Sequence, residues 1–184
     1  MIRTSAHPCT FNVASQDRSF GPWTVHGSEV FCESDLSYAF VNLKPVVPGH
    51  VLVSSKRVVP RFLDLSDEES TDLWRLAKRV AGVMEQHCGV SALTLVIQDG
   101  ADAGQTVPHV HVHVLPRRKG DFEENDQVYD AIDAASQDQA AALRSHAEHH
   151  DKDVHVDAKT SEERVPRSAE DMAAEARKLR PLFG

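Results

Sequence analysis

Three histidines alternate with three valines in the run His109-Val110-His111-Val112-His113-Val114. Alternate side chains of a β-strand project to the same face of the sheet. The spacing therefore predicts that the three imidazoles share one face and the three valines the other. Valines suit a hydrophobic core, whereas three histidines in register on one face need a chemical explanation.

The first interpretation is a solvated polar surface, and the second is a zinc site. Strict alternation with valines disfavours a merely solvated surface. At a rise of about 3.3 Å per residue, the outer two histidines lie about 13 Å apart along the strand. Zinc binds imidazole nitrogen at about 2.1 Å, and two inward-reaching rings span only about 11 Å, so three histidines cannot easily share one ion. A site built on two of them would need further ligands, and no His or Cys cluster offers these at a recognisable spacing.

The third interpretation, which we favour, is nucleophilic catalysis at phosphorus by the central histidine, His111. Neutral imidazole is a good nucleophile near pH 7. Its attack on a phosphate forms a nitrogen-linked nucleotidyl intermediate that water then hydrolyses. His109 and His113 lie about 6–7 Å to either side. Their rings are placed to stabilise the charge that develops on phosphate oxygens.

The loop before this strand has the residue types of a phosphate-binding turn. Gly104, Gln105 and Thr106 offer a permissive backbone, an amide and a hydroxyl. Glycine lets main-chain N–H groups approach a phosphate closely. Gln98, at the end of the preceding strand, adds a neutral donor.

The surrounding pattern predicts an α+β domain with a mainly antiparallel sheet. Ser66 and Glu69 form a capping box that opens a long helix over 67–88, which Gly89 ends. Ser168 caps a short C-terminal helix. The expected strands are 29–33, 38–43, 50–54, 92–98 and 107–115.

Composition narrows the functional class. The chain has 184 residues and a net charge of −8, which argues against a nucleic-acid binder. It contains no apolar run long enough for a membrane span. The three scattered cysteines suggest neither a disulfide framework nor a structural zinc cluster, and they favour a reducing intracellular location.

Two segments fall outside the expected domain core. Residues 1–19 are predicted to be a flexible extension, with organelle targeting as the alternative. Residues 20–184 are predicted to form one domain that carries a mobile insert at about 133–166. The insert is rich in Ala, Gln, Asp, His and Glu and lacks a sustained apolar stripe.

The motifs together resemble the histidine triad superfamily, and within it the fragile histidine triad branch of bis(5'-adenosyl)-triphosphatases. The similarity covers about 20–132 and 167–184. It rests on the His-x-His-x-His run and on the segments Leu36–Asn42, Lys44–His50, Gln98–Gly100, Ala103–Val107 and Gly120–Phe122.

This resemblance implies a five-stranded antiparallel sheet with one long helix and a C-terminal helix. It also implies hydrolysis of diadenosine triphosphate to AMP and ADP through a nucleotidyl group on His111. His109 and His113 would flank the nucleophile, His113 contacting phosphate oxygens, and His50 would support the triad. The implied substrate contacts are Asn42 to ribose, Gln98, Gly104, Gln105, Thr106 and Val107 to phosphates, and Phe20, Val25 and Phe40 to adenine.

Further properties follow from the same resemblance. The implied assembly is a homodimer whose two sheets continue into one another. Mg²⁺ or Mn²⁺ would accompany the substrate, and no metal would be ligated by the protein. The implied location is the cytoplasm, extending to the nucleus. Two alternatives stay open: a phosphoramidate hydrolase of the sister branch, and a signalling module whose nucleotide-bound form recruits a protein partner through Tyr129 and the insert.

Overall fold

A five-stranded antiparallel sheet forms the centre of the computed structural model, which describes residues 16–148 and 166–184, with side chains of the second helix described through Gln137. The strand order is β3–β4–β5–β7–β6. The strands are β3 (Val30–Glu33), β4 (Ser37–Val41), β5 (Val51–Ser55), β6 (Ala92–Val96) and β7 (His111–Arg117). The helices are α1 (Asp67–Cys88), α2 (Gln127–Glu148) and α3 (Ala169–Leu179). A hairpin of β1 (Arg18–Phe20) and β2 (Trp23–Val25) precedes the sheet. The predicted α+β class, the sheet, the long helix and the C-terminal helix are confirmed.

Helix α1 begins and ends where its local sequence requires. The Ser66 hydroxyl accepts a hydrogen bond from the Glu69 amide at 3.2 Å, and the Glu69 carboxylate accepts one from the Ser66 amide at 2.8 Å. This reciprocal capping satisfies two amides that the first turn leaves without partners. Gly89 ends the helix in the left-handed region, at φ 61°.

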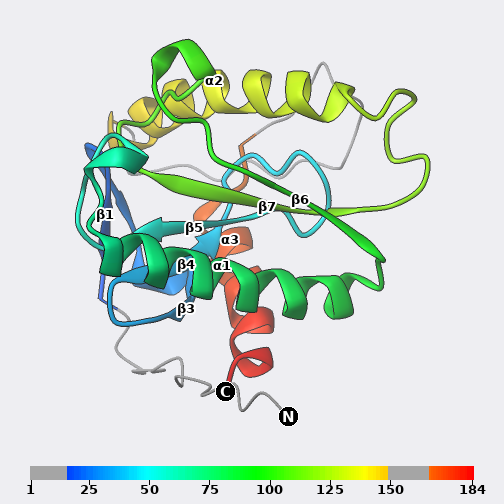
Figure 1. Cartoon of the computed structure of the whole chain (residues 1–184), viewed down its shortest axis with the longest axis horizontal. Helices are drawn as coiled ribbons and strands as arrows, with labels where there is room; N and C mark the ends of the chain where they lie inside the picture. The colour runs from blue at the N-terminus through cyan, green and yellow to red at the C-terminus, as the bar shows by residue number, and fades with distance from the viewer. Residues whose placement is uncertain (1–15, 149–165) are drawn as a thin grey trace.

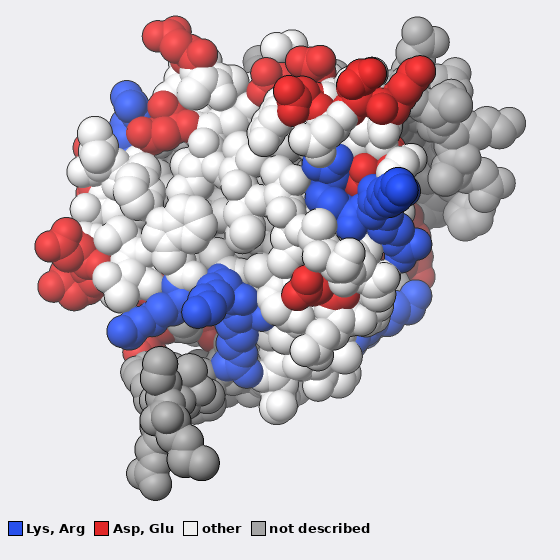
Figure 2. All heavy atoms as spheres, turned by 45° about the vertical axis from the view of Figure 1, so that its right-hand side comes forward, with Lys and Arg blue, Asp and Glu red and all other residues white. Residues whose placement is uncertain are grey.

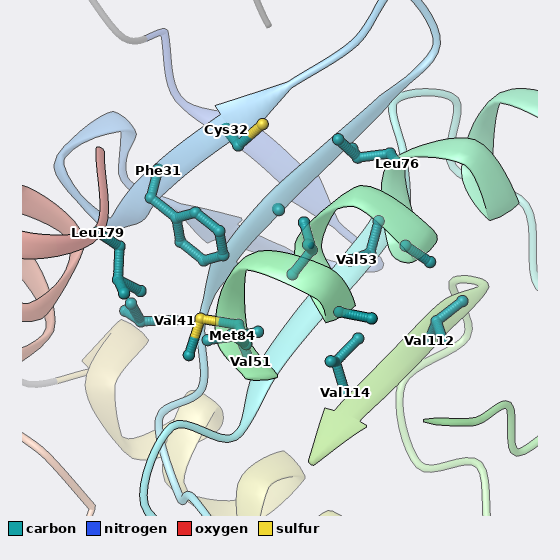
Figure 3. Close-up of a cluster of buried hydrophobic side chains, with 14 of the residues drawn as sticks. Phe31, Cys32, Val41, Val51, Val53, Leu76, Met84, Val112, Val114 and Leu179 are labelled. Carbon is teal, nitrogen blue, oxygen red and sulfur yellow. The ribbon is translucent and has the colours of Figure 1, made fainter. Parts of the chain in front are cut away.

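The main core lies between α1 and one face of the sheet (Figure 3). Val110, Val112 and Val114 are buried there, as the alternating pattern predicts. They meet helix residues such as Leu76 and Met84. Because the valines face α1, the histidines between them face the opposite side of the sheet.

Helix α2 lies on the other side of the sheet from α1 (Figure 1). Val128, Ile132 and Ala135 are buried against Val46, Val47 and Leu115. The sequence interpretation missed this helix, because few large apolar side chains mark its inner face and alanines and polar residues make up most of the segment. The predicted insert at 133–166 is thus helical as far as Glu148, and residues 149–165 lie outside the described part of the chain.

Several boundaries differ from the sequence prediction. The histidine strand enters the sheet at His111 rather than Val107, because Val110 donates its N–H to the Val59 carbonyl of a loop. It continues through Pro116, which lies beyond the last residue paired with β5. Arg18 and Ser19 belong to β1, so the structured part begins inside the predicted 1–19 extension.

Two further features concern cysteines and surface charge. Cys32 is disulfide-bonded, against the expectation from cysteine spacing, whereas Cys88 is a free thiol. On the face in Figure 2, Lys and Arg gather in separate groups with acidic residues between and around them. Among the described helices, none has the length and apolar character to cross a bilayer.

Candidate active site

His111 is held in a single tautomer by its own strand. Its Nδ1 lies 2.7 Å from the carbonyl oxygen of His109, so Nδ1 carries the proton and donates it. The other ring nitrogen, Nε2, therefore keeps its lone pair. The side chain is 5% exposed, so this nitrogen lies in a nearly dry environment. An oriented, unprotonated Nε2 is what a histidine nucleophile requires.

The tautomer of His113 is determined by two successive hydrogen bonds, the first of which comes from a backbone amide. The Val46 amide donates to His50 Nδ1 at 3.1 Å, which places the His50 proton on Nε2. His50 Nε2 then donates to His113 Nδ1 at 3.0 Å. The His113 proton must consequently sit on Nε2. This atom is one of three buried side-chain nitrogen or oxygen atoms in the described residues that lack a hydrogen-bond partner.

Asn42 joins the same series of hydrogen bonds, and both ends of its side-chain amide have a partner within the protein. Its side-chain nitrogen lies 3.2 Å from His50 Nδ1, and its oxygen accepts from the Lys44 amide at 3.1 Å. The amide orientation is thereby determined. Asn42 thus contacts His50, which in turn orients His113, a connection that strand spacing alone does not show.

His109 is fully buried and bound at both ring nitrogens. The Gly21 amide donates to Nδ1 at 3.1 Å, so Nε2 carries the proton. Nε2 lies 3.1 Å from both the Arg57 carbonyl and the Ser55 hydroxyl. With both nitrogens occupied, His109 has no lone pair for phosphorus or for a metal. It positions the strand and supplies the carbonyl that orients His111.

The three residues predicted to line an adenine pocket lie together beside the triad. Phe20, Val25 and Phe40 belong to one buried cluster with Tyr38 and Val107. The Phe20 ring meets His111 edge to face at a centroid distance of 5.1 Å and meets Phe40 at 5.1 Å. The β1–β2 hairpin, which the sequence interpretation missed, carries Phe20 and Val25 to this position.

Burial keeps all three triad histidines neutral. Desolvation lowers the pKa of His111 to about 4, although its hydrogen bond to the His109 carbonyl works in the opposite direction. Burial also lowers the pKa of His113 well below its usual value, and neighbouring histidines add to the effect. The pKa of His109 is lowered chiefly by burial too. The site therefore offers neutral imidazoles at pH 7.

The residues predicted to bind phosphate bond chiefly to α2 and to neighbouring loops. Gln98 is buried and bonds to α2: its amide nitrogen donates to the Asp133 carboxylate, and its oxygen accepts from the Ser136 hydroxyl at 2.9 Å. Thr106 donates to the Ser136 carbonyl at 2.7 Å.

Gly104 adopts a positive φ of 87° beside Gln98. Gln105 differs from the others, since it bridges the Gly100 amide and the Pro60 carbonyl. It holds the loop in shape rather than pointing toward the triad.

The site contains groups that the sequence interpretation did not single out. Gly21 and Ser55 bond to His109, and Val46 bonds to His50. Two of these bonds come from backbone amides, which carry no side-chain signal. Asp133 and Ser136 reach Gln98 only because α2 folds over the sheet. Within residues 16–148 and 166–184, no group of three or more His, Cys, Asp or Glu side chains could hold a metal ion.

Comparison with known proteins finds a family model and relatives that are similar to this chain. A family model described as the HIT domain covers residues 24–120. The chain belongs to the HIT, or histidine triad, family. The bis(5'-adenosyl)-triphosphatase of Dictyostelium discoideum is 48% identical over 164 residues, which span 89% of this chain and 91% of that protein. This confirms the family and the branch inferred from the sequence motifs.

A second relative and a solved structure are also similar to this HIT chain. The bifunctional bis(5'-adenosyl)-triphosphatase/adenylylsulfatase FHIT of Arabidopsis thaliana is 48% identical over 90% of this chain and 83% of its own length. The crystal structure of Plasmodium falciparum diadenosine triphosphate hydrolase in complex with Cyclomarin A shares 32% identity and a TM-score of 0.57, over 70% of this chain and 88% of that one.

Proposed function

We propose that this HIT protein hydrolyses dinucleoside polyphosphates and cleaves diadenosine triphosphate to AMP and ADP. The observation that carries the proposal is the pair of oriented nitrogens at the centre of the site. His111 presents an unprotonated Nε2, and His113 presents a buried Nε2–H without a protein partner. The names of the relatives, bis(5'-adenosyl)-triphosphatase and diadenosine triphosphate hydrolase, support the choice of substrate.

The first step is the transfer of an adenylyl group to His111. The Nε2 lone pair attacks the α-phosphorus, and the bond from phosphorus to the bridging oxygen breaks, so that ADP leaves with the electron pair of that bond. Nδ1 keeps its proton, and the His109 carbonyl stabilises the positive charge that the ring acquires. His113 donates its Nε2 hydrogen bond to an oxygen of the reacting phosphates.

The second step returns the enzyme to its starting state. Water attacks the phosphorus and releases a proton to solvent, while the bond between phosphorus and Nε2 of His111 breaks and its electron pair returns to Nε2. AMP leaves, and Nε2 regains its lone pair. The His109 carbonyl keeps the proton of His111 on Nδ1, and the donor His50 occupies Nδ1 of His113 and so keeps its proton on Nε2. Neither ring therefore has to change tautomer between the two steps.

Binding roles are assigned by position. We assign adenine to the surroundings of Phe20, Val25 and Phe40, beside the nucleophile. We assign the phosphates to Gln98 and to the loop Gly104–Val107, whose shape Gln105 maintains, and ribose to the Asn42 region. Mg²⁺ or Mn²⁺ enters as part of the substrate, since the phosphates themselves supply its oxygen ligands.

A homodimer is part of the proposal. β6 is an edge strand, its residues are exposed or half-buried, and Leu95 is 40% exposed. A second copy that pairs along β6 would cover this edge and continue the sheet. Light scattering of wild type and Leu95→Lys tests this, with a dimer expected for the first and a monomer for the second. A wild-type monomer would contradict it.

Two properties from the sequence interpretation stay proposals. We place the protein in the cytoplasm and nucleus, which imaging of a tagged full chain tests. A nucleotide-dependent protein partner remains the alternative role. It predicts a partner that binds His111→Asn as well as wild type whenever nucleotide is present.

The decisive experiment follows the covalent intermediate. Purified protein with Mg²⁺ and diadenosine triphosphate is expected to release AMP and ADP. Mass spectrometry of the quenched reaction is expected to find AMP on His111. His111→Asn is expected to lower kcat by roughly a thousandfold or more. His26→Asn, which changes an exposed histidine, provides the matched control. Undiminished turnover by His111→Asn would refute the nucleophile, and preference for an adenosine phosphoramidate would move the protein to the sister branch.

A further inference from the structure

The first half of α2, Gln127–Ser136, covers part of the sheet face that carries the triad. On β7, His111, His113 and Leu115 share that face, and Leu115 is in the cluster that buries Val128 and Ile132. Figure 1 shows α2 along this side of the sheet, with α1 on the other. The helix therefore lies beside the reacting groups rather than on a remote surface.

Three polar contacts join this half-helix to the groups assigned to phosphate. Asp133 accepts from the Gln98 amide, Ser136 donates to the Gln98 oxygen at 2.9 Å, and Thr106 donates to the Ser136 carbonyl at 2.7 Å. A Cβ at Gly104 would come within 2.7 Å of the Asp133 oxygen and 2.5 Å of the Gln98 nitrogen. Only glycine at this position leaves room for the contact.

We propose that Gln127–Ser136 is a lid over the polyphosphate site, and that Asp133 occupies the place of a phosphate oxygen on Gln98. The proposal rests on the proposed function, which assigns Gln98 to phosphate. Carboxylate and phosphate oxygens are both anionic acceptors for an amide donor. The Gln98 N–H that serves Asp133 is withdrawn from a phosphate, and an adjacent polyphosphate also repels the carboxylate. The Gln98 nitrogen has two N–H donors, and a phosphate that takes the one serving Asp133 must displace the carboxylate.

The exposure of Asp133 makes that displacement feasible. Asp133 is an exposed residue although its carboxylate reaches the buried Gln98. Because water can reach this hydrogen bond, its net contribution is the modest one of an ordinary hydrogen bond, and an incoming anion can replace it. Ser136 is 4% exposed and holds the inner end of the lid more firmly.

The chain before the lid is anchored to the triad strand. Arg117, the last residue of β7, donates to Asp121 at 2.7 Å and to Asn125 at 3.2 Å. Its guanidinium also lies 5.1 Å from the centre of the Phe122 ring. The start of α2 is thus tied to β7, so that a lid released from Gln98 stays close to the site.

Kinetics of Asp133→Ala test the proposal. We expect KM for diadenosine triphosphate to fall about three- to tenfold, as removal of one ordinary hydrogen bond from the closed state predicts, with kcat within about twofold of wild type. Asp130→Ala is the matched control, because it removes the same charge from an exposed position one turn earlier. An unchanged or raised KM for Asp133→Ala, relative to this control, would overturn the lid.

Hydrogen exchange gives a readout that needs no turnover. The amides of Gln127–Ser136 are expected to exchange several-fold faster in Asp133→Ala than in Asp130→Ala. A methylene-bridged, non-hydrolysable diadenosine triphosphate is expected to accelerate the same amides in wild type. Added protection of these amides by the analogue would show that substrate closes the helix and would refute displacement. Absence of turnover by wild type would refute the proposed function itself, whereas turnover with unchanged KM and exchange would refute the lid alone.

Discussion

The low pKa of His111 predicts that activity persists well below neutral pH. Attack on phosphorus requires neutral Nε2, and burial lowers the pKa of this ring from 6.5 to about 4. The neutral form is therefore dominant above about pH 5 and is lost as pH falls through about 4. An ordinary histidine would lose it near 6.5. His113 reinforces the effect, because burial lowers its pKa as well.

The same shift has a calculable cost in stability. A shift from 6.5 to about 4, at about 1.4 kcal/mol per pH unit, amounts to about 3 kcal/mol. The unfolded state binds the proton first, so stability is complete above pH 6.5 and is lost progressively down to about pH 4. At pH 5 the unfolded ring is mostly protonated and the folded ring is not. His111 should therefore lower the free energy of unfolding by about 2 kcal/mol between pH 7 and 5.

Two measurements check these values. The pH profile of kcat/KM, which reports the free enzyme, should show its acid limb near pH 4. The phosphates of diadenosine triphosphate carry no group that titrates between pH 5 and 8, so a flat profile over that range would report the low pKa of the protein's histidine. Urea unfolding at pH 7 and 5 should show an acid loss that is about 2 kcal/mol smaller in His111→Asn than in wild type. His26→Asn, a change at an exposed histidine, is the matched control.

An acid limb near pH 6.5 would refute the reasoning, because the nucleophile would then titrate like a solvated histidine. Equal acid losses for wild type and His111→Asn would refute the linkage. Either result would mean that water reaches the His111 ring more freely than its 5% exposure implies.

Three further substitutions test separate parts of the structure. Gly104→Ala should lower the free energy of unfolding by about 1–3 kcal/mol and raise KM, since φ is 87° and the new Cβ would lie 2.5 Å from the Gln98 nitrogen; a neutral result would contradict the tight approach. His50→Leu should lower kcat about ten- to a hundredfold because His113 loses its donor, and His50→Gln should recover part of it; equal kcat in both variants would show that the donor is unimportant. Ser66→Ala should lower the free energy of unfolding by about 1 kcal/mol and leave kcat/KM unchanged, which chemical denaturation and steady-state assays would show.

The local sequence determined the parts of this protein whose information is short-range. The capping box of Ser66 and Glu69 and the left-handed Gly89 bound α1 as predicted, because caps depend on residues within a turn of one another. The alternation of histidine and valine assigned each side chain to its face, because strand geometry has a period of two. These two patterns were enough to separate the core face from the chemical face.

Tertiary structure determined the protonation, the burial and the polar contacts of the side chains on the histidine face of the sheet. The tautomer of His113 depends on His50 and on the Val46 amide that donates to His50, and a backbone amide leaves no side-chain signal in the sequence. Burial sets the pKa of His111, and burial comes from Phe20 on a hairpin remote in sequence. The contact of Asp133 with Gln98 spans 35 residues and exists only because α2 packs on the sheet. Spacing predicted the nucleophile and its own strand orients it, but only packing between distant segments buries the ring and orients His113 beside it.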